Sequence, residues 1–268
     1  GGGVGGGGSM VLYGYSLGAM FALTWAAGWP TDRVNAVVAV CGAARCGDVN
    51  AVFLDSLSAA LLPAAVADHT EDEGVEEEQR WRRRRRQSLD TFAKIYAGWG
   101  VGAPFYTEKV WQRCGYSSLD DFVERSYVAG FANADPADLM AQLRTWRSAR
   151  TKSSHHHHQH DQHGGDDGGG DGSTDGVTAE ELRNVTARVL LLPGSSDKYF
   201  LLQEVERHEA KLIPRAKLVS IPSPWGHRAG DPHRPGQEED AAFLRREIGT
   251  FLGENASVVN EDAKVLVK

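Results

Sequence analysis

Long apolar runs are missing from this sequence, and its few cysteines lack the spacing of metal or disulfide frameworks. No stretch approaches the ~20 apolar residues of a membrane-spanning helix, which predicts a soluble protein with no membrane partner. Cys41, Cys46 and Cys114 cannot all pair within the chain and form no C-x-x-C motif, so we expect reduced thiols and no metal site. Residue 1 is Gly instead of Met. We therefore expect the natural start to lie upstream, which leaves the compartment open between cytoplasm and organelle.

Positive charge is also in deficit. The chain has 29 Lys and Arg against 36 Asp and Glu, a net charge of −7. Nucleic-acid binding needs a basic face, and the single basic run, at 80–86, follows an acidic block at 71–78. We expect no nucleic-acid partner, and a small neutral or polar substrate. The two adjacent charged blocks are typical of a disordered or nearly disordered insertion.

Glycine is abundant but concentrated at 1–8 and 164–172, where the chain is of low complexity. The histidines and aspartates of 153–176 are possible metal ligands, but such tracts lack the defined spacing of a metal site, which favours a solvated segment. The predicted organisation is a disordered leader (1–9), a first core part (10–47), a helical cap (48–150), a disordered His/Asp/Gly-rich insertion (151–180), a second core part (181–253) and a C-terminal tail (254–268).

The folded segments alternate between strand and helix patterns. Apolar, strand-like runs occur at 10–13, 34–40, 188–193 and 217–222, and helical periodicity occurs at 19–27, 201–212 and 238–252. This alternation predicts an α/β fold with a mostly parallel sheet flanked by helices. The region 48–150 has helical periodicity without a convincing strand, which predicts an inserted helical cap. Asp135 followed by Pro136 marks the start of one of its helices.

The sequence Gly-Tyr-Ser-Leu-Gly at 14–18 lies between a predicted strand and a predicted helix. In that setting a G-x-S-x-G motif indicates a nucleophilic serine on a sharp, strained turn, with small residues on either side to prevent clashes. We assign Ser16 as the nucleophile, with Gly14 and Gly18 as the small residues. The backbone N–H of Leu17, at the helix N-terminus, is the expected oxyanion donor.

A serine hydroxyl needs an imidazole to accept its proton and a carboxylate to orient that imidazole. Asp197 and His227 each follow a predicted strand, so both should lie at the same edge of a parallel sheet as Ser16. The alternative for Asp197 is a helix cap near Tyr199. The alternative for His227 is an exposed loop histidine.

Several motifs resemble the homoserine O-acetyltransferase-like branch of the α/β-hydrolases. They are GYSLGAM at 14–20, NAVFL at 50–54, YAGWG at 96–100, FY at 105–106, DLMAQLRTW at 138–146, SDKYF at 196–200 and SPWGH at 223–227. The resemblance implies acyl transfer through an acyl-Ser16 intermediate, from an ester or from acyl-CoA as a co-substrate, with no resident cofactor. It suggests Arg144 and Arg45 as ligands of an acceptor carboxylate. Tyr15, Leu17 and Ala19 resemble a hydrolase-like subgroup, so plain ester hydrolysis is the alternative.

The same resemblance implies several strands and an oxyanion loop ahead of the nucleophile, where this chain has only a glycine-rich leader and the short run 10–13. We therefore expect a partial fold with about half of the strands, and an open edge at 10–13 that could pair with another chain, for example in a homodimer. Losing one oxyanion donor costs roughly 10²–10³ in rate. The expectation is a poorly folded or nearly inactive chain, and a catalytically incompetent fragment that only binds is the remaining alternative.

Overall fold

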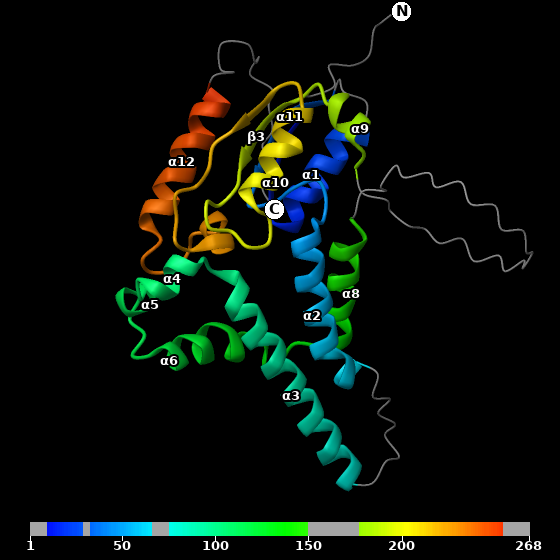
Figure 1. The fold of residues 1–268 in the computed structure, drawn as a ribbon, viewed down its shortest axis with the longest axis vertical. Helices are drawn as coiled ribbons and strands as arrows, with labels where there is room; N and C mark the ends of the chain where they lie inside the picture. The colour runs from blue at the N-terminus through cyan, green and yellow to red at the C-terminus, as the bar shows by residue number, and fades with distance from the viewer. Residues whose placement is uncertain (1–9, 29–32, 66–74, 150–176, 254–268) are drawn as a thin grey trace, which may run out of the picture.

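The computed structural model describes residues 10–28, 33–65, 75–149 and 177–253 (Figure 1). Its centre is a four-stranded parallel sheet with the strand order β1-β2-β3-β4. The strands are β1 (Met10–Tyr15), β2 (Val34–Val40), β3 (Arg188–Leu192) and β4 (Ala216–Leu218). Among the described strands, β1 pairs only with β2, so it lies at an edge of this sheet, as the sequence predicts. The α/β class and the parallel sheet are confirmed.

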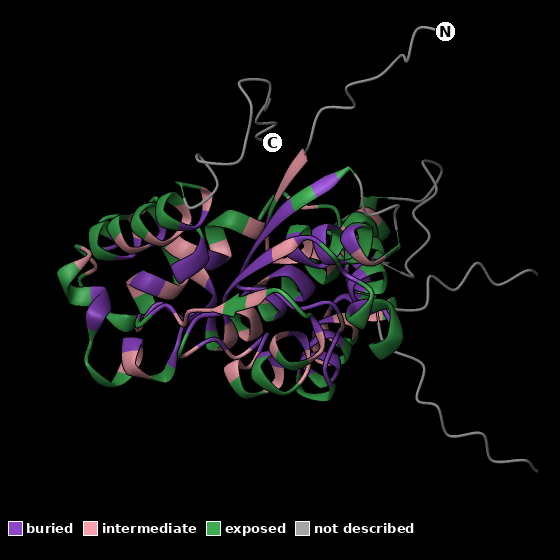
Figure 2. Ribbon diagram, turned by 90° about the horizontal axis from the view of Figure 1, so that it is seen from above, coloured by how far each residue is buried: buried purple, intermediate pink, exposed green. Residues whose placement is uncertain are grey.

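Strands β2 and β3 are buried on both faces, because apolar residues occupy successive positions and successive side chains point to opposite faces. Val37, Ala39 and Leu191 contribute to one core, whereas Val38 and Leu190 contribute to the other. Figure 2 shows these buried strands between helices whose outer surfaces are exposed. The sheet therefore separates two apolar cores.

Helices cover both faces of the sheet. The first core includes residues of α1 (Leu17–Gly28), α2 (Asp48–Ala65), α8 (Pro136–Ser148), α9 (Ala179–Arg183), α10 (Leu202–Arg207) and α11 (Glu209–Leu212). The second includes residues of α4 (Ala103–Thr107), α5 (Val110–Arg113), α6 (Leu119–Val123), the π-helix η1 (Glu124–Val128), the 3₁₀ helix η2 (Gly226–Gly230) and α12 (Glu238–Gly253). The long α3 (Val75–Gly100) contributes to both cores, and the short α7 (Ala129–Phe131) follows η1.

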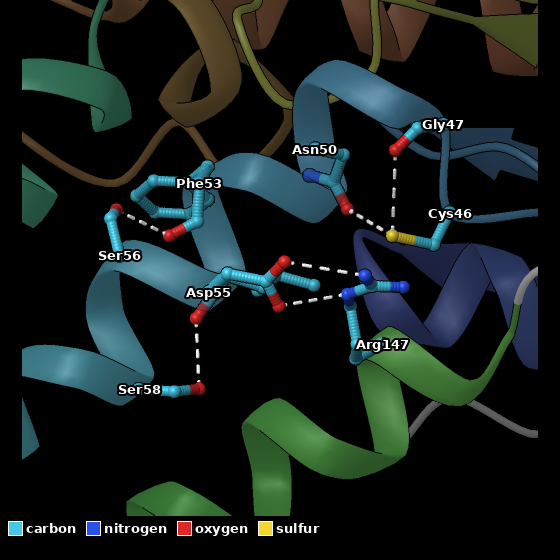
Figure 3. A network of polar contacts seen from close by, with 9 residues as sticks. Cys46, Gly47, Asn50, Phe53, Asp55, Ser56, Ser58 and Arg147 are labelled. Carbon is cyan, nitrogen blue, oxygen red and sulfur yellow. Dashed lines mark hydrogen bonds and ion pairs between the residues drawn. The ribbon is translucent and has the colours of Figure 1, made fainter. Parts of the chain in front are cut away.

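Among the described residues between β2 and β3, every regular element is helical. Figure 3 shows how α2 and α8 are joined: Arg147 donates from Nε to Asp55 Oδ1 at 2.9 Å and from Nη2 to Oδ2 at 3.2 Å. α8 starts where the sequence predicts, since the Asp135 side chain accepts hydrogen bonds from the first turn and Pro136 is its first residue.

The prediction that the charged blocks are disordered is wrong for the described part. Residues 75–86 form the first half of α3, which projects away from the sheet (Figure 1). Glu and Arg are good helix formers, and the Glu78–Arg82 ion pair has the i, i+4 spacing that supports a helix. Charge patterning alone therefore mistook a solvated helix for a disordered segment. Residues 71–74 and the tract 153–176 lie outside the described residues.

Some predicted boundaries also shift. β1 continues to Tyr15, β4 ends at Leu218, and beyond it a single bridge links Gly194 to Ile221. The helix predicted over 201–212 is broken at His208, whose backbone (φ −106°, ψ −85°) is not helical. Residues 177–180 belong to the predicted disordered insertion, but the side chain of Thr178 forms a capping box with Glu181 at the start of α9, which begins at Ala179.

Candidate active site

Ser16 occupies the turn between β1 and α1. It has φ of +56°, a left-handed conformation that is uncommon for a residue with a side chain. The turn is held because Ser16 N–H donates to Val40 O at 3.0 Å and Ala19 N–H donates to Ser16 O at 2.9 Å. Leu17 N–H opens α1 and has no recorded acceptor within the described part of the chain. The hydroxyl is therefore lifted above the sheet edge next to a free backbone donor.

The two motif glycines have different roles. A Cβ on Gly14 would lie 2.2 Å from Gly18 O, so the strand can approach the helix only if residue 14 is glycine. A Cβ on Gly18 would meet nothing within 4 Å, so the clash that the sequence analysis assigned to Gly18 does not exist. The second tight position is instead Gly42, whose Cβ would lie 2.7 Å from Ser16 O.

The structure brings Ser16, Asp197 and His227 together. His227 Nε2 lies 2.8 Å from Ser16 Oγ, and His227 Nδ1 lies 2.9 Å from Asp197 Oδ2. The Asp197 side chain is fully buried and that of His227 is nearly so. With Nδ1 protonated, the imidazole donates to the carboxylate and presents the Nε2 lone pair to the serine hydroxyl.

The alternative of a helix cap near Tyr199 does not hold, because the next helix, α10, begins only at Leu202 with Leu201 as its N-cap. Asp197 holds a turn and contacts His227 as well. Its Oδ1 accepts hydrogen bonds from Tyr199 N at 2.8 Å and Phe200 N at 3.4 Å, which holds the turn after β3. Its Oδ2 remains for His227. One carboxylate thus fixes its own loop and orients the imidazole.

A cavity of about 210 Å³ opens beside Ser16. It is lined by Ser16, Leu17, Phe92, Tyr96, Phe131, Leu139, Gln142, Leu143 and Trp146. Most of the lining is aromatic or aliphatic and none of it is charged. The cap helices α3 and α8 supply most of these residues, so the cap roofs the serine. Their apolar periodicity is visible in the sequence, but it does not distinguish a pocket wall from a core face.

The two arginines suggested as substrate ligands lie elsewhere. Arg144 is exposed on α8, and its neighbours Leu143 and Gln142 line the cavity instead. Arg45 is half-buried near His208 and Glu209. Burial lowers the pKa of His208 and Arg45 lowers it further, whereas burial raises the pKa of Glu209 against the opposing effect of Arg45. A larger cavity, of about 700 Å³, lies between α5, α12 and the segment before η2, and its lining contains none of the three triad-like residues.

Two further predictions concern thiols and metals. All three cysteines are free, and Cys41 and Cys46 are buried, in agreement with a packing role. The described ranges contain no group of His, Cys, Asp and Glu that could hold a metal ion, and the His-rich tract lies outside them. No helix within the described ranges is long and apolar enough to cross a bilayer.

The chain is similar in structure to known proteins. No family model and no curated protein matches the chain. Among solved structures, it is similar to the acetyl esterase MekB (21% identity, TM-score 0.68, covering 92% of this chain and 61% of that one). It is also similar to an acetylester hydrolase from Corynebacterium glutamicum (19%, 0.67, 91% and 60%) and to homoserine O-acetyltransferase from Bacillus anthracis (16%, 0.64, 96% and 61%).

The chain thus spans about 60% of the length of these solved structures. At such low identity, the similarity establishes architecture and not substrate. The parallel sheet flanked by helices agrees with this match. The chain has the α/β-hydrolase fold.

Proposed function

We propose that this chain carries the catalytic centre of a serine-dependent esterase or acyltransferase that works through an acyl-Ser16 intermediate. The observation that carries the proposal is the continuous chain of hydrogen bonds from Asp197 through His227 to Ser16, with distances of 2.9 and 2.8 Å. A buried carboxylate, an imidazole and a serine on a strained turn are the parts that acyl transfer requires.

In the proposed reaction, Ser16 Oγ attacks the substrate carbonyl while its proton moves to His227 Nε2. The carbonyl oxygen becomes an oxyanion, which Leu17 N–H stabilises at the positive end of α1. The tetrahedral intermediate collapses, and the leaving alkoxide takes the proton from Nε2. An acyl-Ser16 ester remains. Asp197 stays ionised and stabilises the imidazolium in each step.

A second substrate completes the cycle. His227 Nε2 removes a proton from water or from an acceptor hydroxyl, whose oxygen then attacks the acyl carbonyl. The bond to Ser16 Oγ breaks, and Oγ takes the proton back from Nε2. The uncharged lining of the cavity supports a neutral acyl group, because an unpaired charge would be costly to desolvate there. Neither Arg144 nor Arg45 lines that cavity, which favours water, and hence ester hydrolysis, over an amino-acid acceptor.

The first test is labelling of the purified, folded chain with a fluorophosphonate probe, followed by peptide mapping. We expect labelling at Ser16 and none in Ser16→Ala. Hydrolysis of neutral short-chain esters, measured beside acetyl transfer from acetyl-CoA to homoserine, separates hydrolase from transferase. A folded chain that is neither labelled nor active would refute the proposal and favour the alternative of a fragment that acts only by binding.

A further inference from the structure

We propose that Tyr15 is a positioning residue that fixes η2, and through it His227, against the end of strand β1. The inference rests on the proposed roles of Ser16 and His227 and assigns a function to the residue directly before the nucleophile. Tyr15 is the last residue of β1 and directly precedes Ser16. A side chain that contacts Tyr15 is therefore held at a defined position relative to Ser16.

Tyr15 contacts the base in two ways. Its ring stacks on the imidazole of His227 with a centroid distance of 5.1 Å and an interplanar angle of 30°. Its hydroxyl donates to the backbone oxygen of His227 at 3.2 Å. One residue therefore restrains both the ring and the main chain of His227.

The other end of η2 rests on the same side chain. A Cβ on Gly230 would lie 2.7 Å from Tyr15 Cε2 and 2.8 Å from Cys41 Sγ, so the last residue of η2 packs directly on the tyrosine ring. Burial raises the pKa of Tyr15 far above its usual range, which keeps the phenol protonated and able to donate. The tyrosine thus supports η2 at its second and last residues.

Such support is needed because η2 lies outside the sheet. The contacts of Nδ1 with Asp197 and of Nε2 with Ser16 fix two points of the imidazole, but they leave the ring free to rotate about the line that joins these points. The ring of Tyr199 meets the imidazole edge-on, with a centroid distance of 4.6 Å, and limits this movement on one side. The stacked ring of Tyr15 limits it on another. Misplacement of a reacting group by ~1 Å costs roughly 10² in rate. Since Tyr15 does not line the cavity, its loss should affect the chemical step and leave substrate binding unchanged.

The test compares Tyr15→Phe and Tyr15→Leu with Tyr13→Phe, a control on the same strand whose side chain is 45% exposed. Phe keeps the stacked ring, so we expect a loss of about fivefold in kcat, the value of one hydrogen bond. Leu removes both contacts, and we expect a loss of roughly 10² in kcat and in the rate of fluorophosphonate labelling, with KM unchanged. Wild-type rates in both Tyr15 variants would overturn the proposal, as would a loss confined to KM.

A second measurement is independent of turnover. In protein with ¹⁵N-labelled histidine, the hydrogen-bonded Nδ1 proton of His227 should give a downfield NMR signal. That signal should broaden or vanish in Tyr15→Leu and persist in Tyr13→Phe. If wild-type protein is never labelled at Ser16 but the signal responds to Tyr15→Leu, the proposed function fails and the positioning role stands. An unchanged signal in folded Tyr15→Leu contradicts the positioning role itself.

Discussion

His227 Nε2 lies 2.8 Å from Ser16 Oγ, although 211 residues separate the two in sequence. Ser16 follows β1 and His227 follows β4, and these strands form opposite edges of the sheet. Three inter-strand spacings, about 14 Å, separate them. The segment after β4 must therefore return across the carboxyl ends of the inner strands, where it passes Asp197. The site depends on the strand order of the whole sheet.

The double role of Asp197 predicts that its activity and stability functions can be separated. Asp197→Asn keeps an oxygen for Tyr199 N but sets an amide against His227 Nδ1, so we expect a folded protein with kcat reduced by roughly 10⁴. Asp197→Ala removes both acceptors and should also lower the free energy of unfolding by about 1 kcal/mol. Ester hydrolysis and urea denaturation measure the two effects. Equal destabilisation by Asn and Ala would argue against the turn-holding role of Oδ1.

The serine turn predicts opposite outcomes for two glycine substitutions. Gly14→Ala forces a methyl group to 2.2 Å from Gly18 O, and backbone atoms cannot yield to it cheaply, so we expect a large loss of soluble, folded protein. Gly18→Ala enters open space in α1 and should be neutral or stabilising by up to about 1 kcal/mol. Thermal denaturation of the matched pair is the measurement. A stable Gly14→Ala protein would contradict the close approach of strand and helix.

Glu209 predicts a pH dependence of stability. Burial raises the pKa of its carboxyl above the ordinary 4.5, despite the hydrogen bond from Ala44 N at 2.8 Å and the nearby Arg45. A raised folded-state pKa contributes stability that is present below the unfolded pKa and lost as pH rises through the folded one. Glu209→Gln keeps the acceptor for Ala44 N and cannot ionise.

The melting temperature of Glu209→Gln relative to wild type should therefore increase between about pH 4 and pH 7. The exposed Glu206→Gln serves as the control and should track wild type at each pH. A difference that is constant with pH would mean that the folded-state pKa of this carboxyl is not raised above its unfolded value.

The cavity wall predicts acyl-chain selectivity. Phe131 lines the cavity from the cap and packs edge-on against Phe92 at 4.9 Å. Phe131→Ala enlarges the cavity beside Ser16. Each additional methylene of a substrate that fits into an apolar pocket raises kcat/KM by roughly 10-fold or more. We expect the preference among neutral esters to move from short to longer acyl chains. Leu62→Ala, on the exposed face of α2, is the control. An unchanged chain-length profile would place the acyl group elsewhere.

The open edge predicts self-association of the isolated chain. α1 has no charged residue, and its Phe21 and Trp25 are 57% and 46% exposed. Among the described strands, β1 pairs only with β2. Exposed apolar patches and free strand edges favour association, so Phe21→Ser with Trp25→Ser should reduce the mass measured by light scattering. An unchanged oligomeric state in the double variant would exclude this face as the contact.

Local sequence patterns predicted helices and strands correctly where a single interaction, such as burial or helix capping, determines the local structure. The valine-rich run at 34–40 and the Asp135–Pro136 start of α8 appear as expected, because burial on both faces and helix capping are properties of a few adjacent residues. The charged blocks were misjudged because their composition indicates solvation, which a projecting helix also satisfies. Arg144 and Arg45 came from a resemblance, and residue identity gives no information on the direction in which a side chain points.

The α/β class, the serine turn and the strands that precede Asp197 and His227 can be predicted from local sequence, because hydrophobic periodicity and turn chemistry act over a few residues. Three relationships are visible only in the folded chain: Asp197 divides its two oxygens between a turn and an imidazole, Gly42 and not Gly18 is the second tight glycine, and Tyr15 contacts η2. These relationships depend on strand order and on the packing of segments far apart in the chain, and no local pattern specifies either.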